Sequence, residues 1–353
     1  MDAPLSHISA ARYWTACGSP RIGPPIDNVE ATEFDAPSPR VTENCRKLGF
    51  LGDELHFTVS SQRQRRKRKG IVAHSCSKPL PKGSVVTLGN GIAICSPELV
   101  FVQMGTVLSM PQLACFGMAL CGIYAVDPFH RSPSFPESSG SRLSGLPRRD
   151  QLIAKDRLAS FATENARIER SVRARAALRL MLERSRSPME SVTAIMLSAP
   201  VSKGGFALPA PLLNCRVKLP TWLHRGVRTA AAFNEPDPYA ECDFVFSRDK
   251  KLVLVDHHGE WSHSGEKNIH HDSLRSNAFA DIRLPYFTIT KRQFFDLELL
   301  EKLAAQIQSR LGIRKRIYVD DPERRRRLLH DELSAFVSEH SRNPLAFLSD
   351  RRA

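Results

Sequence analysis

The sequence lacks several features that would assign it to a well-defined class. None of its eight cysteines forms a Cys-x-x-Cys pair, so a structural zinc site is not expected. Its first residues contain no basic segment followed by an apolar stretch, so we expect no secretory signal and, with reduced thiols, a cytoplasmic protein. Internal repeats are also missing. Hydrophobic residues make up 42% of the 353 residues, which excludes a wholly disordered chain and suggests two or three packed domains.

Acidic residues are in short supply relative to basic ones. The chain has 37 Asp and Glu against 51 Lys and Arg, a net charge of +14. An enzyme that acts on small neutral metabolites does not need this excess, whereas a protein that binds a polyanion such as DNA does. The alternative is that the charge only keeps the protein soluble.

A long uninterrupted hydrophobic run is missing as well. The segment from Leu99 to Val126 carries no charge and is long enough to span a bilayer, but polar residues and a proline interrupt it midway. We therefore predict two buried helices that join near Ser109, and no membrane partner.

Residues 1–127 have the pattern of a small α+β region. A short helix is expected from Leu5 to Thr15. Strands are expected at four segments: residues 56–60, 70–74, 85–88 and 92–95. The turn sequence Gly89-Asn90-Gly91 joins the last two strands. The first two are expected to form a hairpin with a charged tip.

The tip of this expected hairpin is strongly basic. Six of its seven residues are cationic: Arg63, Arg65, Arg66, Lys67, Arg68 and Lys69. Like charges packed this closely repel, and a phosphate backbone would remove the repulsion and release counterions. The segment therefore predicts a nucleic-acid contact, the alternatives being a solvated loop or a localisation tract. No aromatic residue lies between the charges, so stacking on single strands is not indicated.

The remainder of the chain divides into three parts. Residues 128–186 combine a Ser- and Pro-rich linker with a basic helix, and residues 313–353 form a basic tail or helix. Between them, residues 187–312 show the order α-β-β-β-α-β-α, which predicts an α/β domain with a mixed sheet. Its last helix is expected to run from Phe294 to Leu311.

Two acids in the segment 187–312 are candidates for chemistry. A short charged stretch separates the strands that carry Asp243 and Asp256, so an antiparallel hairpin should bring the two carboxylates together. Neighbouring carboxylates repel unless a cation lies between them, and Mg²⁺ takes oxygen ligands. Such an ion would activate a water for attack on a phosphodiester. The alternative is two acids at ordinary strand ends.

Glu190 and the nearby histidines also have two interpretations each. Glu190 stands three residues after Ser187, a spacing that predicts a helix capping box as readily as a metal ligand. His258 shares a strand face with Asp256 and, like His263, is a candidate for proton transfer. The histidines of this region lack cysteine partners at ligand spacing, so zinc is not favoured.

The segment from Ser187 to Gly312 resembles the very-short-patch-repair-like (Vsr-like) branch of the PD-(D/E)XK nuclease superfamily. The matching residues, in the order of the family's motifs, are Ser187-Pro188-Met189-Glu190, Gly204 to Pro209 with Asn214, Asp243-Phe244, Leu252 to Gly259 with His263, Asp272 to Arg275, and Phe287 to Thr290. The resemblance implies a restriction-endonuclease-like core that hydrolyses phosphodiesters with a bound metal, possible Mg²⁺ ligands being Glu190, Asp243 and Asp256.

The chain departs from the pattern of this branch at one motif. The branch usually reads Glu-x-Asp-Gly, whereas this chain reads Asp256-His257-His258-Gly259. Aspartate shortens the carboxylate arm by one methylene, and histidine removes a negative charge. The resemblance therefore leaves two hypotheses: a metal-dependent endonuclease with a degenerate site, or a DNA-binding regulator that keeps the fold without the activity.

The upstream region resembles the domain of abortive-infection (AbiEi-type) antitoxins. The matching segments are Leu5 to Ala11, His56 to Val59, and Val85 to Cys95 with Ser96-Pro97-Glu98. This resemblance implies a DNA-contacting or regulatory role and a protein partner of the toxin–antitoxin type. Arg275 is a further candidate for a DNA phosphate contact, although an ion pair with Asp272 explains it equally well. A scaffold that meets an acidic protein is a weaker alternative.

Overall fold

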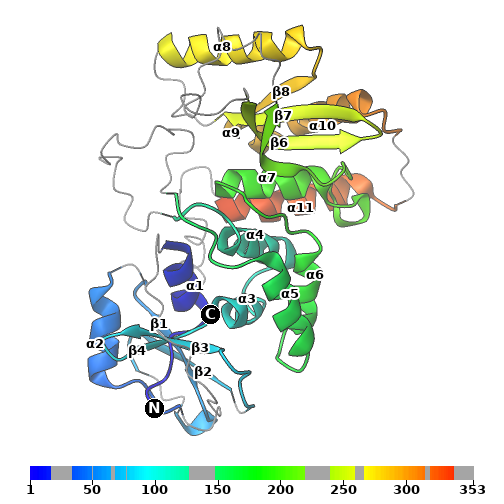
Figure 1. Ribbon diagram of the computed structural model, residues 1–353. Coiled ribbons are helices and arrows are strands. Elements are labelled where there is room, and N and C mark those ends of the chain that lie inside the picture. Colours follow the sequence, from blue (N-terminus) through cyan, green and yellow to red (C-terminus); the bar gives the residue numbers. More distant parts are fainter. Residues whose placement is uncertain are drawn as a thin grey trace. The chain divides into compact units, whose positions relative to one another are not determined.

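The computed structural model describes residues 1–16, 34–49, 51–64, 68–76, 78–126, 148–218, 239–258, 266–314 and 319–337. These residues form two compact units, the first from Met1 to Met181 and the second from Leu182 to Val337 (Figure 1). Several predicted positions lie outside the described residues: Arg65, Arg66, Lys67, His263 and most of the expected linker.

The first unit contains two short strand pairs. Strands β1 (Leu55–Val59) and β2 (Ile71–Ser75) pair in parallel, with Leu55 opposite Ile71. The expected charged hairpin is therefore wrong, because the two strands of a hairpin are antiparallel. Strands β3 (Val85–Gly89) and β4 (Ile92–Cys95) form the expected antiparallel pair.

Two left-handed residues make the tight turn between β3 and β4. Asn90 has a φ of 52° and Gly91 a φ of 75°. Both are residues that tolerate this region, and the combination is the one that matches the twist of a hairpin. The turn sequence therefore predicted this part of the fold correctly.

The N-terminal segment joins the two strand pairs. Leu5 bridges Phe57 of β1 and Ile94 of β4, and its amide and carbonyl bond to Ala93 and Cys95 at 2.8 Å each. Helix α1 (His7–Ala16) follows at once, where a helix was predicted. The indole of its buried Trp14 donates to the Cys95 carbonyl at 2.9 Å. Helix α2 (Pro39–Lys47) begins at the capping residue Ser38.

Buried helices complete the first unit. The uncharged run folds into α3 (Pro97–Met104) and α4 (Met110–Leu120), and Ser109 caps the second with a capping box, as predicted. Helix α5 (Lys155–Glu164) and the basic helix α6 (Ser171–Leu178) pack against them and belong to this unit. Arg173 of α6 donates to the carbonyls of Gly105 and Leu108, at the C-terminal end of α3.

The second unit is built on a mixed four-stranded sheet. Helix α7 (Pro188–Ser198) precedes strands β5 (Leu212–Lys218), β6 (Tyr239–Arg248) and β7 (Lys251–His258). Helix α8 (Glu266–Asp281) and strand β8 (Tyr286–Thr290) follow. The strand order is β5-β6-β7-β8, antiparallel except for the parallel β7-β8 pair. The predicted mixed α/β class and mixed sheet are confirmed.

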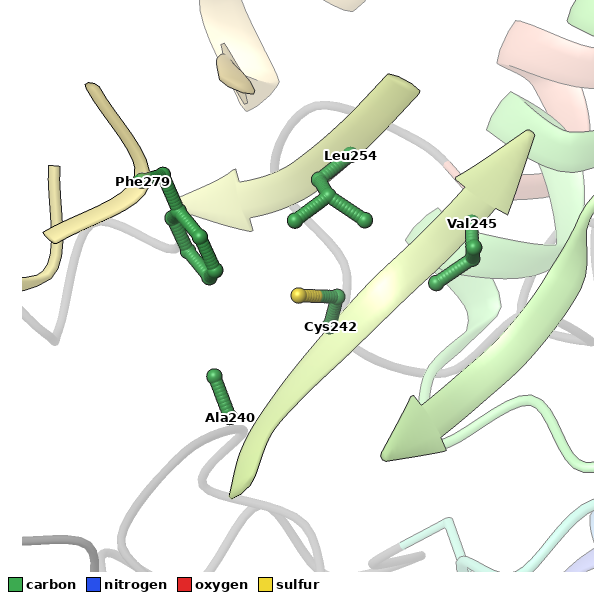
Figure 2. Close-up of a cluster of buried hydrophobic side chains, with 5 residues drawn as sticks. All are labelled: Ala240, Cys242, Val245, Leu254 and Phe279. Carbon is green, nitrogen blue, oxygen red and sulfur yellow. The ribbon is translucent and has the colours of Figure 1, made fainter. Parts of the chain in front are cut away.

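Helices cover the sheet of the second unit. Figure 1 shows α8 on one side of the sheet and α7 on the other. On the α8 side, Phe279 packs on a buried cluster of sheet residues that includes Cys242 and Leu254 (Figure 2). Helix α11 (Pro322–Val337), at the position of the expected basic tail or helix, contacts α7.

The expected last helix of the core is divided in two. Helix α9 (Lys291–Phe295) ends at Asp296, whose side chain accepts the Leu299 amide at 3.1 Å and so starts α10 (Leu297–Arg310). An aspartate in this position is a strong helix-starting residue. In the part of the chain that the structure describes, no helix has both the length and the apolar character needed to cross a membrane.

Candidate functional site

Glu190 lies in the first turn of α7 and is 4% exposed. Its amide donates to the Ser187 hydroxyl at 3.1 Å, and the hydroxyl interacts with Glu190 Oε1 at 3.1 Å. Its Oε2 accepts the Arg186 amide at 2.8 Å. Ser187 therefore caps the helix, while the Glu190 carboxylate accepts the amide of Arg186 instead of the Ser187 amide that a complete capping box requires.

Asn214 of β5 links Glu190 to the sheet. Its side-chain amide donates to Glu190 Oε2 at 2.7 Å and to the Arg184 carbonyl at 2.8 Å. Its backbone is left-handed, with a φ of 50°, and the residue is 2% exposed. The carbonyl oxygen of the same side chain is buried and has no hydrogen-bond partner among the described residues. An orphaned acceptor beside buried carboxylates is costly unless another group satisfies it.

Asp243 and Asp256 meet as the hairpin predicted. Residues 244 and 255 are paired on β6 and β7, which places the two acids side by side on the neighbouring strands. The Asp243 amide donates to Asp256 Oδ1 at 3.0 Å, and the His257 amide donates to Asp243 Oδ2 at 2.7 Å. Each carboxylate thus binds the backbone of the other strand.

Arg275 of α8 is paired with the second of these acids. One of its terminal nitrogens lies 2.7 Å from Asp256 Oδ2 and 3.4 Å from Cys242 Sγ, and it also donates to the Glu241 carbonyl. The Tyr286 hydroxyl donates to the same Asp256 oxygen at 2.8 Å. Both oxygens of Asp256 therefore have protein donors. Arg275 supplies a positive charge to one of the two acids between which a bound cation was expected.

Two of these acids, Asp243 and Glu190, have a raised pKa. Burial, followed by the charges of Glu190 and Asp256, raises the pKa of Asp243 well above its ordinary value. Burial also raises the pKa of Glu190, against the hydrogen bonds that it accepts. For Arg275, burial lowers the pKa, but the charge of Asp256 outweighs this effect and the net pKa is raised. The site is thus a crowded carboxylate cluster in which the charge of Arg275 acts on Asp256 and that of Arg186 on Glu190.

The two histidines after Asp256 occupy different environments. Enclosure of the ring lowers the pKa of His257 to about 4, and its Nε2 is buried without a hydrogen-bond partner among the described residues. His258 is half-buried at the end of β7. Its role in proton transfer stays a prediction.

The structure brings Glu190, Asp243 and Asp256 into one region. Across the described ranges, however, no three His, Cys, Asp or Glu side chains are arranged so as to hold a metal ion. Arg275 was predicted to contact a DNA phosphate. Its side chain is only 14% exposed and forms an ion pair with Asp256, so it stabilises the interior of the second unit. The sequence did not assign roles to Asn214 or Tyr286, because their contacts join distant segments.

Of the basic segment at residues 63–69, the structure describes the two ends. Arg63, Arg68 and Lys69 are exposed. Arg68 donates to the Pro37 carbonyl at 3.1 Å, just before α2, and the Arg46 guanidinium of α2 lies beside Gly70. Basic side chains of the segment and of α2 therefore lie close together on this unit.

No family model, curated protein or solved structure matches this chain. The resemblance to Vsr-like nucleases and AbiEi-type antitoxins therefore stays a prediction.

Proposed function

We propose that the protein is a DNA-binding regulator whose second unit keeps an acidic, nuclease-like centre without using it for hydrolysis. The observation that carries this proposal is that both carboxylate oxygens of Asp256 already have donors within the protein. Its two oxygens receive donors from Asp243, Arg275 and Tyr286. A divalent cation would have to displace a buried guanidinium from this carboxylate, and breaking a buried ion pair is costly.

The basic residues supply the DNA-binding part of the proposal. A net charge of +14 and three exposed cations at the ends of one basic segment favour a polyanionic partner. Phosphate contacts of this kind are independent of base sequence. A protein partner of the toxin–antitoxin type and a cytoplasmic location are compatible with this role and stay predictions.

Salt dependence tests the binding. We expect the affinity for a duplex to fall steeply with salt, and the triple variant R63A/R68A/K69A to reduce the slope of log K against log [salt] by about 3. The matched control removes the same charge from exposed positions of the second unit, K302A/R310A/R314A. If both variants reduced the salt slope equally, the DNA contact would not lie at the basic segment. An affinity that does not change with salt would contradict DNA binding.

A second candidate is a metal-dependent nuclease. The raised pKa of Asp243 and the orphaned oxygen of Asn214 favour it, because a cation beside Glu190 and Asp243 would relieve both. In that case those residues would hold Mg²⁺, and the ion would activate a water for attack on phosphorus.

Plasmid nicking separates the two candidates. We expect no cleavage of supercoiled plasmid by the full-length protein in Mg²⁺ or Mn²⁺. Cleavage that persists through purification and is abolished in both Asp243→Asn and Glu190→Gln would establish the nuclease instead. Activity that survives both substitutions would belong to a contaminant.

A further inference from the structure

Two cysteines of the second unit lie directly opposite each other on neighbouring strands. Cys215 of β5 and Cys242 of β6 are register partners in the antiparallel pair. Directly opposed residues on antiparallel strands have Cα atoms about 4.5–5.5 Å apart, which lies within the range that disulfides bridge. Their side chains share one face of the sheet. Cys215 packs against the buried cluster that contains Cys242, and Figure 2 shows Cys242 within that cluster.

The thiols of this pair are free but differ in access. Cys242 is fully buried, whereas Cys215 is half-buried and its sulfur lies 3.7 Å from the Arg216 carbonyl in an exposed contact. Asn214, next to Cys215, has a left-handed backbone, but the register of β5 on β6 continues without a shift on both sides of it, so the two cysteines stay opposed.

We propose that Cys215 and Cys242 form a redox-active pair that closes into a cross-strand disulfide when a low-molecular-weight disulfide oxidises it. This inference does not depend on the proposed DNA-binding role. In a reducing compartment the pair stays open, and such disulfides form transiently when the oxidant rises.

The chemistry proceeds in two exchanges. The thiolate of Cys215 attacks one sulfur of oxidised glutathione, which releases one glutathione and leaves a mixed disulfide on Cys215. Cys242 then loses its proton, attacks the Cys215 sulfur and releases the second glutathione. Two protein thiols are oxidised and one glutathione disulfide is reduced to two thiols, so electrons and protons balance.

The second exchange should be the slower one. The attacking sulfur of Cys242 is fully buried, whereas that of Cys215 is half-buried. Mixed disulfide at Cys215 should therefore accumulate first, and the cross-strand bond should follow.

Peptide mapping of the full chain under non-reducing conditions tests the proposal. After treatment with oxidised glutathione, we expect a peptide that links Cys215 to Cys242 within one chain. Both C215S and C242A should lack it, whereas C76S, which removes another half-buried thiol, should retain it. Alanine is used at position 242 because the site is apolar and buried.

Thermal unfolding provides an independent measurement. The bond would close the loop from Cys215 to Cys242, and we expect the oxidised second unit to melt about 5 °C higher than the reduced one. C215S should show no such shift. A glutathione adduct that never progresses to the linked peptide, a bond to another cysteine, or a bond between two chains would each overturn the proposal.

Discussion

Both units bury a group of polar side chains between strands and a helix, but the two groups differ in charge. In the first unit, the rings of His7 and His74 stack at 3.6 Å, and His56 Nδ1 lies 2.9 Å from His74 Nε2. In the second unit, Asp243 and Asp256 lie side by side with Arg275 as counter-charge. One group is stable because it is neutral, and the other because its charges are partly balanced.

This difference predicts opposite responses to pH. Burial and the neighbouring imidazoles lower the pKa of His7 well below 6.5 and that of His56 to about 3. Unfolded histidines therefore bind protons first as the pH falls, and the first unit loses stability below about 6.5. The raised pKa values of Asp243 and Glu190 act in the reverse sense, because folded carboxylates then bind protons first.

The largest expected effect is therefore acid unfolding of the first unit alone. Each histidine with a lowered pKa should cost about 1.4 kcal/mol per pH unit below 6.5, so His7 and His56 together should cost about 4 kcal/mol at pH 5. Hydrogen exchange measured from pH 8 to pH 5 should show amides of β1 and β2 losing protection while those of α7 keep theirs. Parallel loss of protection in both units would contradict the comparison.

Removal of the counter-charge should strongly destabilise the second unit. Arg275→Met leaves Asp256 buried without its cation, which should lower the free energy of unfolding by about 3–5 kcal/mol in urea denaturation at pH 7. Asp256→Asn in the same chain should restore much of this loss, because the unpaired charge is removed.

A second arginine provides the matched control for this variant. Arg326 is also buried, but its partner Glu301, at 2.7 Å, is 42% exposed. Arg326→Met leaves a carboxylate that water can reach, so its cost should be clearly smaller. If both variants lowered the free energy of unfolding equally, the effect would come from lost arginine packing and not from the unpaired carboxylate of Asp256.

Removal of the Glu190 carboxylate should have an intermediate effect on the stability of the second unit. Glu190→Ala removes the acceptor of the Arg186 amide and of the Asn214 side chain, at an expected cost of about 2 kcal/mol. Glu190→Gln keeps an acceptor oxygen and should retain most of the stability. Added Mg²⁺ should not change the melting temperature of the wild type. A marked rise with Mg²⁺ that Glu190→Gln abolishes would favour the metal site instead.

The smallest expected effect concerns the imidazole stack. His74→Phe keeps a ring against His7 but removes the partner of His56, at a cost of about 1 kcal/mol at pH 8. Because His74 lowers the pKa of both other histidines, the variant should also lose less stability per pH unit in acid. An unchanged acid response would mean that burial alone sets these pKa values.

Local features of the sequence predicted most of the elements. The Asn90-Gly91 turn, the capping residue Ser187 and the junction of two buried helices near Ser109 each follow from a few neighbouring residues, and the structure has them. The direction of β2 relative to β1 could not be predicted in this way, because side-chain alternation is the same in parallel and antiparallel pairs. The break at Asp296 carried a recognisable capping signal that the apolar stripe on either side obscured.

The candidate site was predictable only in part. A short connection between two strands sufficed to bring Asp243 and Asp256 together. Pairing of Asp256 with Arg275 depends instead on how α8 lies on the sheet. The spacing of residues within one helix does not predict that orientation. The left-handed backbone of Asn214 is likewise imposed by tertiary contacts.

The position of Leu5 between two strands has a consequence for truncation and for folding of the chain. Because Leu5 pairs with both Phe57 and Ile94, deletion of the first five residues would leave two strands with unsatisfied edges, a common route to self-association. During synthesis, the segment around Leu5 must wait for β4 to emerge before its pairings are complete.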